Sequence, residues 1–223
     1  MIKGRINEIF ESLQGEGIYL GEKQIFVRFF GCNLGCKFCD TRLSSFKEMT
    51  PKELIFEIKK YSGPHHSISF TGGEPLLQKD FLKEVLPLTY KEGYKNYLET
   101  NGTLPDELAE VIDYIDIVAM DLKLPSSTGL YGFWKQHRKF LEIASRKEVF
   151  LKAVICHDTC SIDLVEGLKL IKEVNEYALL VLQPDSEEDE ALKQKLEYCK
   201  EICDKHGITA CIIPQIHRKV GIK

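Results

Sequence analysis

Three cysteines lie close together in one short segment of the sequence, GCNLGCKFCDT, which covers residues 31–41. Three residues separate Cys32 from Cys36, and two residues separate Cys36 from Cys39. Glycines and an asparagine between the thiols indicate a loop. A structural zinc site and a complete four-iron cluster each use four protein ligands, whereas three thiolates around a cubane cluster leave one iron open to a small molecule. We interpret the segment as a loop that binds such a cluster. A zinc site with a distant fourth ligand and a loop with incidental cysteines are the alternatives.

The composition and the first residues of the chain indicate whether the cysteine thiols are reduced or form disulfides. The chain has 223 residues, of which 43% are hydrophobic, and a net charge of −4 with a pI near 5.9. No basic stretch stands out, so we expect no nucleic-acid partner, and the apolar runs are too short to cross a membrane. The start of the chain, residues 1–17, lacks the apolar core of a signal peptide, which predicts a cytoplasmic protein. In that compartment the eight cysteines are better explained as metal ligands, nucleophiles or core residues than as disulfides.

Helices and strands are expected to alternate along the chain. Strands are predicted at residues 25–30, 67–70, 96–100, 116–123, 149–155, 178–183 and 210–214, and helices at 51–62, 79–93, 105–115, 131–146, 162–176 and 189–207. Thr50 is the expected N-cap of the first helix, with Pro51 at its first position, and Pro87 is expected to break the second helix. The strands are apolar nearly throughout, as in parallel sheets covered on both faces. The sequence therefore predicts the α/β class and a barrel or part of a barrel, in a single domain without a linker.

Two segments with candidate site residues each follow a predicted strand. The three cysteines come after the strand at residues 25–30, and SFTGGEP, residues 69–75, continues from the next strand. In parallel βα folds the C-terminal ends of the strands carry the chemistry. By itself GGEP would indicate only a turn before a helix. The cysteine spacing, Phe38 before Cys39 and the GGEP segment together resemble the signature of the radical S-adenosylmethionine (SAM) superfamily.

This resemblance implies a parallel-stranded partial (βα) barrel of the radical SAM type, with a 4Fe–4S cluster on Cys32, Cys36 and Cys39. In that superfamily the GGE motif holds the methionyl amino group of SAM. Backbone carbonyls and a carboxylate suit an ammonium group, and glycine lets the backbone come close. The chain has DLK at residues 121–123, where many relatives carry SPK. The implied SAM-binding residues are Phe38, Gly72, Gly73, Glu74, Asp121, Leu122, Lys123, Gln183 and Pro184.

Further segments resemble one family of the superfamily, the 7-carboxy-7-deazaguanine synthases. They are FESLQGEG (10–17), QIFVRFFGC (24–32), CDT (39–41), LETNGT (98–103), DLKLPSS (121–127), LQP (182–184) and PQIHR (214–218). The resemblance covers most of the chain and is more specific in the first half. It implies a single radical SAM domain over residues 1–223, with an N-terminal substrate loop at 1–24, a partial barrel core at 25–213 and a C-terminal tail at 214–223. It also implies a homodimer.

The family resemblance also implies substrate contacts. Alternation places Phe26, Arg28 and Phe30 on one face of a strand, where an arginine is costly to bury without an anion. A substrate carboxylate bound in a bidentate way would supply that anion, and an internal Asp or Glu is the alternative. LQGEG suits the donor and acceptor edge of a pterin, with a solvated turn as its alternative. Glu99 is implied to contact either the substrate or the SAM ribose. The implied substrate-binding residues are Leu13, Gln14, Gly15, Glu16, Arg28, Thr71, Glu99 and His217.

The reaction implied by the resemblance is the conversion of 6-carboxy-5,6,7,8-tetrahydropterin to 7-carboxy-7-deazaguanine with loss of ammonia, on the route to queuosine and other 7-deazapurines. SAM would be a regenerated cofactor, and a flavodoxin- or ferredoxin-type protein would be the reductant. Thr41 is implied to ligate Mg²⁺ through its hydroxyl, since magnesium prefers oxygen ligands. An ST-turn is the alternative role for this threonine.

The other cysteines are expected to pack in the core. Cys199 and Cys203 share helical spacing with Leu192 and Leu196, which predicts a buried stripe. The alternative is an auxiliary cluster built from Cys156, Cys160, Cys199, Cys203 and Cys211. That cluster would require the buried stripe of a helix to turn toward a loop.

Two other functions stay open at this point. One is a glycyl-radical-enzyme activase, a small radical SAM protein that acts on the backbone of another protein. It would need neither the SLQGEG segment nor a magnesium-binding threonine. The other is a non-catalytic iron–sulfur or zinc protein without SAM chemistry, and the GGEP segment argues against it.

Overall fold

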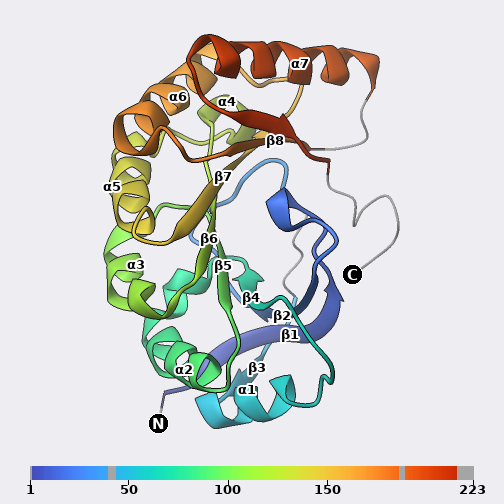
Figure 1. Ribbon diagram of the computed structural model, residues 1–223, viewed down its shortest axis with the longest axis vertical. Helices are drawn as coiled ribbons and strands as arrows, with labels where there is room; N and C mark the ends of the chain where they lie inside the picture. Colours follow the sequence, from blue (N-terminus) through green and yellow to red (C-terminus); the bar gives the residue numbers. More distant parts are fainter. Residues whose placement is uncertain (1, 40–43, 186–188, 215–223) are drawn as a thin grey trace.

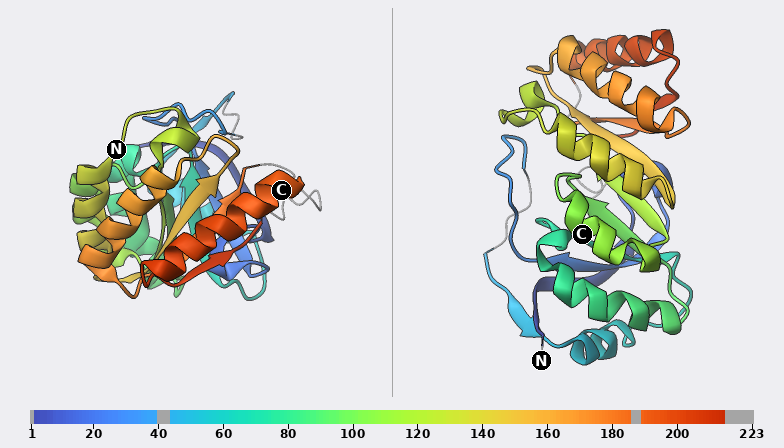
Figure 2. Two further views of the ribbon diagram at one scale, coloured as in Figure 1. Left: turned by 90° about the horizontal axis from the view of Figure 1, so that it is seen from above. Right: turned by 90° about the vertical axis from the view of Figure 1, so that its left-hand side faces the viewer.

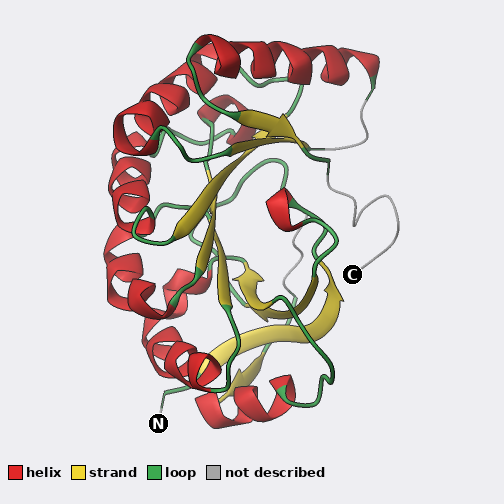
Figure 3. Cartoon of the chain, viewed as in Figure 1, coloured by secondary structure: helices red, strands yellow, loops and turns green. Residues whose placement is uncertain are grey.

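The computed structural model describes residues 2–39, 44–185 and 189–214. In this part of the chain one curved sheet of nine strands is covered by helices on its convex side (Figure 1). The longer helices follow one another along the sheet in a single layer, as the right-hand view of Figure 2 shows, in the order α2 (Lys79–Lys91), α3 (Pro105–Val111), α5 (Trp134–Ala144), α6 (Ser161–Asn175) and α7 (Glu190–Lys205). Strands line the concave side (Figure 3), so the predicted α/β class is confirmed and the sheet has the shape of an incomplete barrel.

Seven strands run parallel, as predicted from the alternating pattern. They are β2 (Lys23–Phe29), β4 (Ser67–Gly72), β5 (Asn96–Thr100), β6 (Ile117–Asp121), β7 (Glu148–Ile155), β8 (Leu180–Pro184) and β9 (Ala210–Ile212). Two strands that the sequence pattern did not predict, β1 (Gly4–Leu13) and β3 (Lys47–Met49), extend the sheet beyond β2 in antiparallel pairing. Among the described strands, β3 and β9 form the two edges.

Strand β1 corrects the expectation that residues 1–24 form a loop. Its register places Phe10 opposite Phe26, and the two rings stack with centroids 5.1 Å apart. The pairing of β1 with β2 covers the first parallel strand, which would otherwise be an exposed edge. The expected loop shrinks to residues 14–22, which join β1 to β2 and include the short 3₁₀ helix η1 (Gly17–Tyr19).

The helices match the predicted pattern closely. They are α1 (Pro51–Ile58), α2 (Lys79–Lys91), α3 (Pro105–Val111), α4 (Pro125–Thr128), α5 (Trp134–Ala144), α6 (Ser161–Asn175) and α7 (Glu190–Lys205), with two more 3₁₀ turns, η2 (Pro75–Gln78) and η3 (Ile112–Tyr114). Thr50 caps α1 as predicted, because its hydroxyl accepts from the Glu53 backbone N–H while the Glu53 carboxylate accepts from the Thr50 backbone N–H.

The predicted break at Pro87 is wrong, since α2 continues through this residue to Lys91. Proline removes one hydrogen bond from the helix. Phe81, Leu82, Val85 and Leu86 on the preceding turns are all buried against the sheet, and this apolar burial keeps the segment helical despite the lost bond.

Apolar side chains fill both sides of the sheet. The larger core lies between the helices and the convex face and contains Cys199 and Cys203, which confirms their predicted place in the core. A smaller cluster on the other face contains Tyr97 and Phe150, and Tyr19 of η1 packs against it. The 14–22 segment is therefore anchored to the concave side of the sheet. No helix in the described ranges has the length and hydrophobicity that a membrane crossing requires.

Candidate functional site

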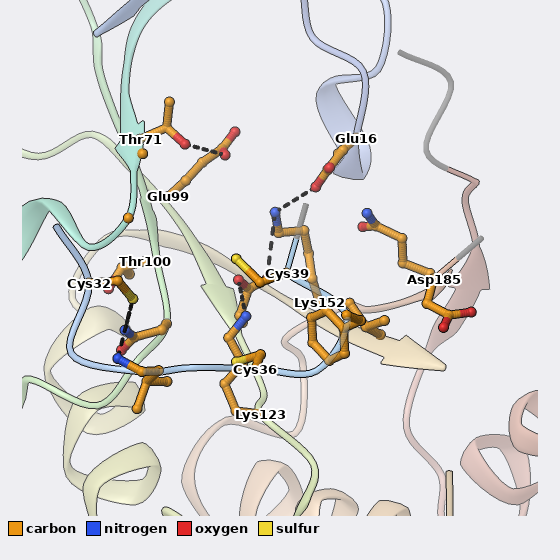
Figure 4. Close-up of a pocket in the computed structure, with 18 residues that line it drawn as sticks. Glu16, Cys32, Cys36, Cys39, Thr71, Glu99, Thr100, Lys123, Lys152 and Asp185 are labelled. Atoms are coloured by element: carbon orange, nitrogen blue, oxygen red, sulfur yellow. Dashed lines mark hydrogen bonds and ion pairs between the residues drawn. The ribbon is translucent and has the colours of Figure 1, made fainter. Parts of the chain in front are cut away.

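A pocket opens at the C-terminal ends of the parallel strands, with a volume of about 1000 Å³ when the solvent at its mouth is included. Figure 4 shows its side chains, which come from the loop after β2, from β4 to β8 and from the 14–22 segment. The pocket brings together residues predicted to bind the cluster, SAM and the substrate. These are Glu16, Cys32, Cys36, Phe38, Cys39, Thr71, Gly72, Gly73, Glu99, Asp121, Lys123 and Gln183.

The cysteine loop, residues 31–39, is held in place by its neighbours. The Lys37 backbone N–H donates to the Thr128 carbonyl at 2.9 Å, and the Glu74 backbone N–H donates to the Gly31 carbonyl at 2.8 Å. A Cβ atom at Gly73 would collide with that same Gly31 carbonyl, so only glycine permits this approach of the two segments. The Asn33 amide donates to the Thr103 hydroxyl at 2.9 Å. The three thiols thus project from a loop fastened to neighbouring segments on several sides.

The thiols fit an iron–sulfur cluster by the chemistry of the donor set. No group of three His, Cys, Asp or Glu side chains within the described ranges is arranged to hold a single metal ion. A cubane cluster does not require such an arrangement, because each thiolate binds a different iron. Cys32 and Cys39 are exposed and Cys36 is half-buried, so all three lie at the pocket surface. Burial raises the pKa of the Cys36 thiol, and the Lys123 ammonium opposes that rise.

Glu74 of the GGE motif is fully buried beneath the pocket rather than in its wall. Its carboxylate accepts hydrogen bonds from the backbone N–H of Asn101 at 2.7 Å, from the backbone N–H of Leu76 at 3.0 Å and from the Thr100 hydroxyl at 2.9 Å. Burial raises the pKa of Glu74 to about 7, although these hydrogen bonds act in the opposite direction. The predicted contact of Glu74 with the SAM amino group stays a prediction.

Three of the predicted substrate residues form one hydrogen-bonded group. The Glu99 carboxylate accepts from the Gln14 amide at 2.7 Å and from the Thr71 hydroxyl at 2.9 Å, one bond to each oxygen (Figure 4 shows the second). The side-chain amide oxygen of Gln14, Oε1, in turn accepts from the Glu16 backbone N–H at 3.1 Å. This group ties the 14–22 segment to the ends of β4 and β5.

Four charged side chains form a second group in the pocket. Lys152 Nζ lies 3.0 Å from Glu16 Oε2 and 3.6 Å from Asp121 Oδ1, and Lys123 Nζ lies 2.8 Å from Asp121 Oδ2. Lys123 also lies over the Phe38 ring, 5.4 Å from its centroid. Burial raises the pKa of Glu16, but the Lys152 charge and hydrogen bonds from Gln183 and Lys152 bring it below its ordinary value. The group is ionised and balanced in charge.

Arg28 does not line the pocket. Its Nε lies 3.0 Å from Glu8 Oε1 across the β1–β2 pair, and its guanidinium carbon lies 5.5 Å from the centroid of the Phe10 ring. The internal acidic partner considered as the alternative is therefore present. Arg28 is paired with Thr71 in the register of β2 and β4, so the two side chains share a face of the sheet. A role for Arg28 in substrate binding stays a prediction.

The other predicted residues that the structure describes are not part of the pocket lining. Leu13 is exposed at the end of β1, and Gly15 follows Gln14 in the 14–22 segment. Leu122 is buried directly after β6, and Pro184 is buried at the end of β8. Thr41 and His217 lie outside the described residues.

Several residues of the pocket were not predicted from the sequence. Lys152 is the main one, and its signal was a single lysine inside the apolar run at residues 149–155. Thr100 and Asn101 belong to the LETNGT segment, which was recognised without a role for these two residues. Leu34, Val154 and Asp185 also line the pocket, and nothing in the sequence distinguished them.

The remaining cysteines do not gather in one place. Burial raises the pKa of Cys203 to about 12, as expected for a thiol on the buried face of α7. Cys211 packs in the smaller cluster on the other face of the sheet, so the sheet separates it from Cys199 and Cys203. None of the eight cysteines, all of which the structure describes, is in a disulfide. The auxiliary-cluster alternative is therefore not supported.

Comparison with known proteins identifies relatives of the whole chain. The sequence profile of the radical SAM superfamily matches residues 26–196. A 7-carboxy-7-deazaguanine synthase from Geobacter sulfurreducens is 35% identical, over 97% of this chain and 96% of its own length. Another from Archaeoglobus fulgidus is 33% identical over 100% of both chains.

Solved structures agree at the level of the fold. The crystal structure of QueE from Escherichia coli has a TM-score of 0.65 and 20% identity, and the match covers 95% of this chain and 94% of that one. Streptococcus suis SuiB bound to S-adenosylmethionine matches with a TM-score of 0.55 at 20% identity, over 82% of this chain and 44% of the other. The synthase name of the curated relatives argues against the activase and the non-catalytic alternatives. By its sequence profile, its full-length relatives and its fold, the chain belongs to the radical SAM superfamily and, within it, to the family of 7-carboxy-7-deazaguanine synthases.

Proposed function

We propose that this chain converts 6-carboxy-5,6,7,8-tetrahydropterin to 7-carboxy-7-deazaguanine with loss of ammonia. One observation carries the proposal. The three-cysteine loop and the polar groups around Glu16 and Glu99 face one pocket, as a cofactor and a substrate that react with each other require. The names of the full-length relatives support the same reaction.

Within this proposal Cys32, Cys36 and Cys39 hold a 4Fe–4S cluster. The cluster and SAM together supply hydrogen-atom abstraction from carbon through one-electron cleavage of SAM. The remaining work belongs to side chains of the chain itself. Gly72 and Gly73, which line the pocket, would bind the SAM ammonium group through their backbone carbonyls. Lys123 and Asp121 form an ion pair in the same pocket wall. Gln183, which is 1% exposed and lines the pocket, offers a buried amide oxygen as a further acceptor.

The substrate side of the pocket consists of Glu16, Thr71 and Glu99. A carboxylate can accept two parallel N–H bonds from the amino-pyrimidinone edge of a pterin, and Glu16 is ionised as such a contact requires. Thr71 and Glu99 fix each other through their mutual hydrogen bond, which limits the rotamers that either side chain can adopt. The protein thereby positions the substrate before the chemical step.

Further components of the proposal come from the family resemblance. Thr41 would hold Mg²⁺ through its hydroxyl oxygen, and the ion would supply positive charge for the substrate carboxylate. A flavodoxin- or ferredoxin-type protein delivers the electron, and the working unit is a homodimer. We place the enzyme in the cytoplasm, where a chain whose eight cysteines form no disulfide is kept reduced.

Anaerobic reconstitution tests the function directly. The reconstituted protein is incubated with SAM, a reductant, Mg²⁺ and carboxytetrahydropterin, and 5′-deoxyadenosine and the deazaguanine product are measured by mass spectrometry. We expect both products, and chelation of Mg²⁺ is expected to lower only the second. Formation of 5′-deoxyadenosine without any deazaguanine would show that the substrate is a different molecule.

A further inference from the structure

Lys152 is the most deeply buried charged group of the pocket wall. It lies in β7 between Leu151 and Ala153, and only 5% of it is exposed. Its ammonium group contacts Glu16 from one direction and Asp121 from another, and Figure 4 shows Glu16 and Lys152 pointing toward each other. Burial lowers the pKa of Lys152, but the charges of Asp121 and Glu16 raise it well above the ordinary value. The lysine is therefore a permanent cation in the wall.

The two carboxylates that Lys152 contacts belong to different parts of the site. Glu16 lies on the 14–22 segment, on the substrate side, whereas Asp121 ends β6 beside Lys123, on the proposed SAM side. The register of the sheet pairs Asp121 with Lys152 directly, so their side chains leave the same face next to each other. Asp121 keeps the Lys123 ammonium at 2.8 Å if Lys152 is removed. Removal of Lys152 should therefore disturb the position of Glu16 more than that of Asp121.

The backbone next to Glu16 packs closely against β7, which brings the Glu16 carboxylate near Lys152. Gly17 has a φ of +66°, and a Cβ atom there would lie 2.7 Å from the Phe150 ring and 3.9 Å from Lys152 Cδ. The segment thus rests on the side chains of two residues of β7, and the Glu16 carboxylate comes within 3.0 Å of the lysine. Without that ammonium group a half-buried carboxylate would face Asp121, and the lowest-energy responses are protonation or rotation toward solvent.

We propose that Lys152 is a positioning residue that holds the Glu16 carboxylate, ionised and oriented, for the amino-pyrimidinone edge of the pterin. The inference rests on the proposed function. Lys152 acts through Glu16 and makes no contact with the reacting atoms. Its removal affects pterin binding first and SAM binding much less, because Asp121 retains Lys123.

The test uses the reconstituted holoprotein with SAM present and no reductant, so that the pterin binds without reacting. Calorimetry then gives the Kd for carboxytetrahydropterin and, separately, for SAM. Lys152→Met removes the charge at similar length and is expected to raise the pterin Kd at least tenfold. Lys152→Gln keeps a neutral donor and is expected to fall between the wild type and Lys152→Met. Both variants should change the SAM Kd less than threefold, and iron content with circular dichroism confirms that each is folded and loaded.

Two controls show whether Lys152 acts through Glu16. Lys123→Met removes the other lysine of the pocket, which contacts Asp121 but not Glu16, and is expected to raise the SAM Kd more than the pterin Kd. Glu16→Gln removes the charge that Lys152 holds, so adding Lys152→Met to that variant should change the pterin Kd less than twofold. A fully additive double variant, or a pterin Kd unaltered in both Lys152 variants, overturns the inference. Wild-type protein that neither binds nor converts the pterin refutes the proposed function instead.

Discussion

Glu74 and Asn101 join two loops of the pocket, because a Glu74 carboxylate oxygen accepts a 2.7 Å hydrogen bond from the backbone N–H of Asn101. The Asn101 side chain then donates to Asn33 Oδ1 at 2.8 Å, within the cysteine loop. A buried carboxylate of the GGE motif is thus linked, through one residue, to the segment that carries the three thiols. This arrangement gives Glu74 a structural role in addition to any contact with SAM.

Replacing Glu74 with Gln should therefore lower the stability of the protein as well as weaken SAM binding. Both carboxylate oxygens accept from backbone N–H groups, and an amide would point its NH₂ group at one of these donors. We expect a loss of about 1–3 kcal/mol in the free energy of unfolding. Thermal unfolding followed by circular dichroism provides the measurement. Unchanged stability would mean that the network rearranges around the amide.

The pH dependence of stability should change in the same variant. The folded protein raises the pKa of Glu74 from 4.5 to about 7, so the folded state binds a proton that the unfolded state has released in that range. The contribution of Glu74 to stability is complete below about pH 4.5 and is lost as the pH rises through 7, a change of roughly 3 kcal/mol. In Glu74→Gln this decline should be absent. Melting temperatures of both proteins between pH 4.5 and 8 test the prediction, and parallel curves would contradict it.

The parallel sheet explains why so much of the site was predictable. Once the cysteines, GGEP, LETNGT and LQP are each placed at the end of a parallel strand, the topology alone gathers them at one edge. The unpredicted part depends on pairings across the sheet. Strand β1 carries charged residues that hide its alternation, and without β1 the Glu8 partner of Arg28 has no place in the fold. Lys152 is a single lysine in an apolar strand, and its role was not predicted because a sequence does not show which two carboxylates will face it.

The eight cysteines should separate into two groups in their response to substitution. Changing Cys32, Cys36 or Cys39 to Ala should abolish the charge-transfer absorbance of the cluster and the cleavage of SAM, with little change in folding. Cys199→Ala removes a thiol that is 2% exposed in the main core and should cost about 1–2 kcal/mol of stability. Its iron content should equal that of the wild type. If a folded Cys199 variant lost about half its iron, that result would support the alternative in which these cysteines bind an auxiliary cluster.

Gly17 and Gly21 offer a matched pair for testing the anchoring of the 14–22 segment. Both have positive φ, +66° and +85°, so alanine strains the backbone at either position. A Cβ atom at Gly21 has no neighbour within 4 Å, whereas one at Gly17 meets the Phe150 ring at 2.7 Å. Gly17→Ala should therefore raise the pterin Kd and lower the melting temperature more than Gly21→Ala does. Equal effects would show that backbone strain alone matters at these positions.

Arg28 can be tested against its internal partner. If it binds the substrate carboxylate, Arg28→Lys should raise the pterin KM and leave SAM cleavage without substrate nearly intact, because lysine cannot form the bidentate pair. Glu8→Gln weakens the ion pair but leaves the guanidinium in place, and its pterin KM should stay within about threefold of the wild-type value. The pterin KM, measured in both variants, shows whether Arg28 binds the substrate carboxylate. If Arg28 only forms the ion pair with Glu8, the two variants should show the same loss of stability, and neither should change the pterin KM.

The residues after Pro214, including His217, lie outside the described residues. Strand β9 runs parallel to β8, which carries Gln183 near its C-terminal end and leads into Asp185 of the pocket wall. Because parallel strands deliver their C-terminal ends to the same edge, the chain leaves Ile212 on the side of the sheet where the pocket opens. Deleting residues after Pro214 should therefore keep the cluster and the SAM cleavage seen without substrate, while most pterin turnover is lost. His217→Ala should show the same pattern more weakly. Paired assays of 5′-deoxyadenosine without substrate and of deazaguanine with it distinguish the outcomes. If the shortened protein forms product at the full rate, these residues contribute nothing to the site, and the 14–22 segment has to close the substrate side without them.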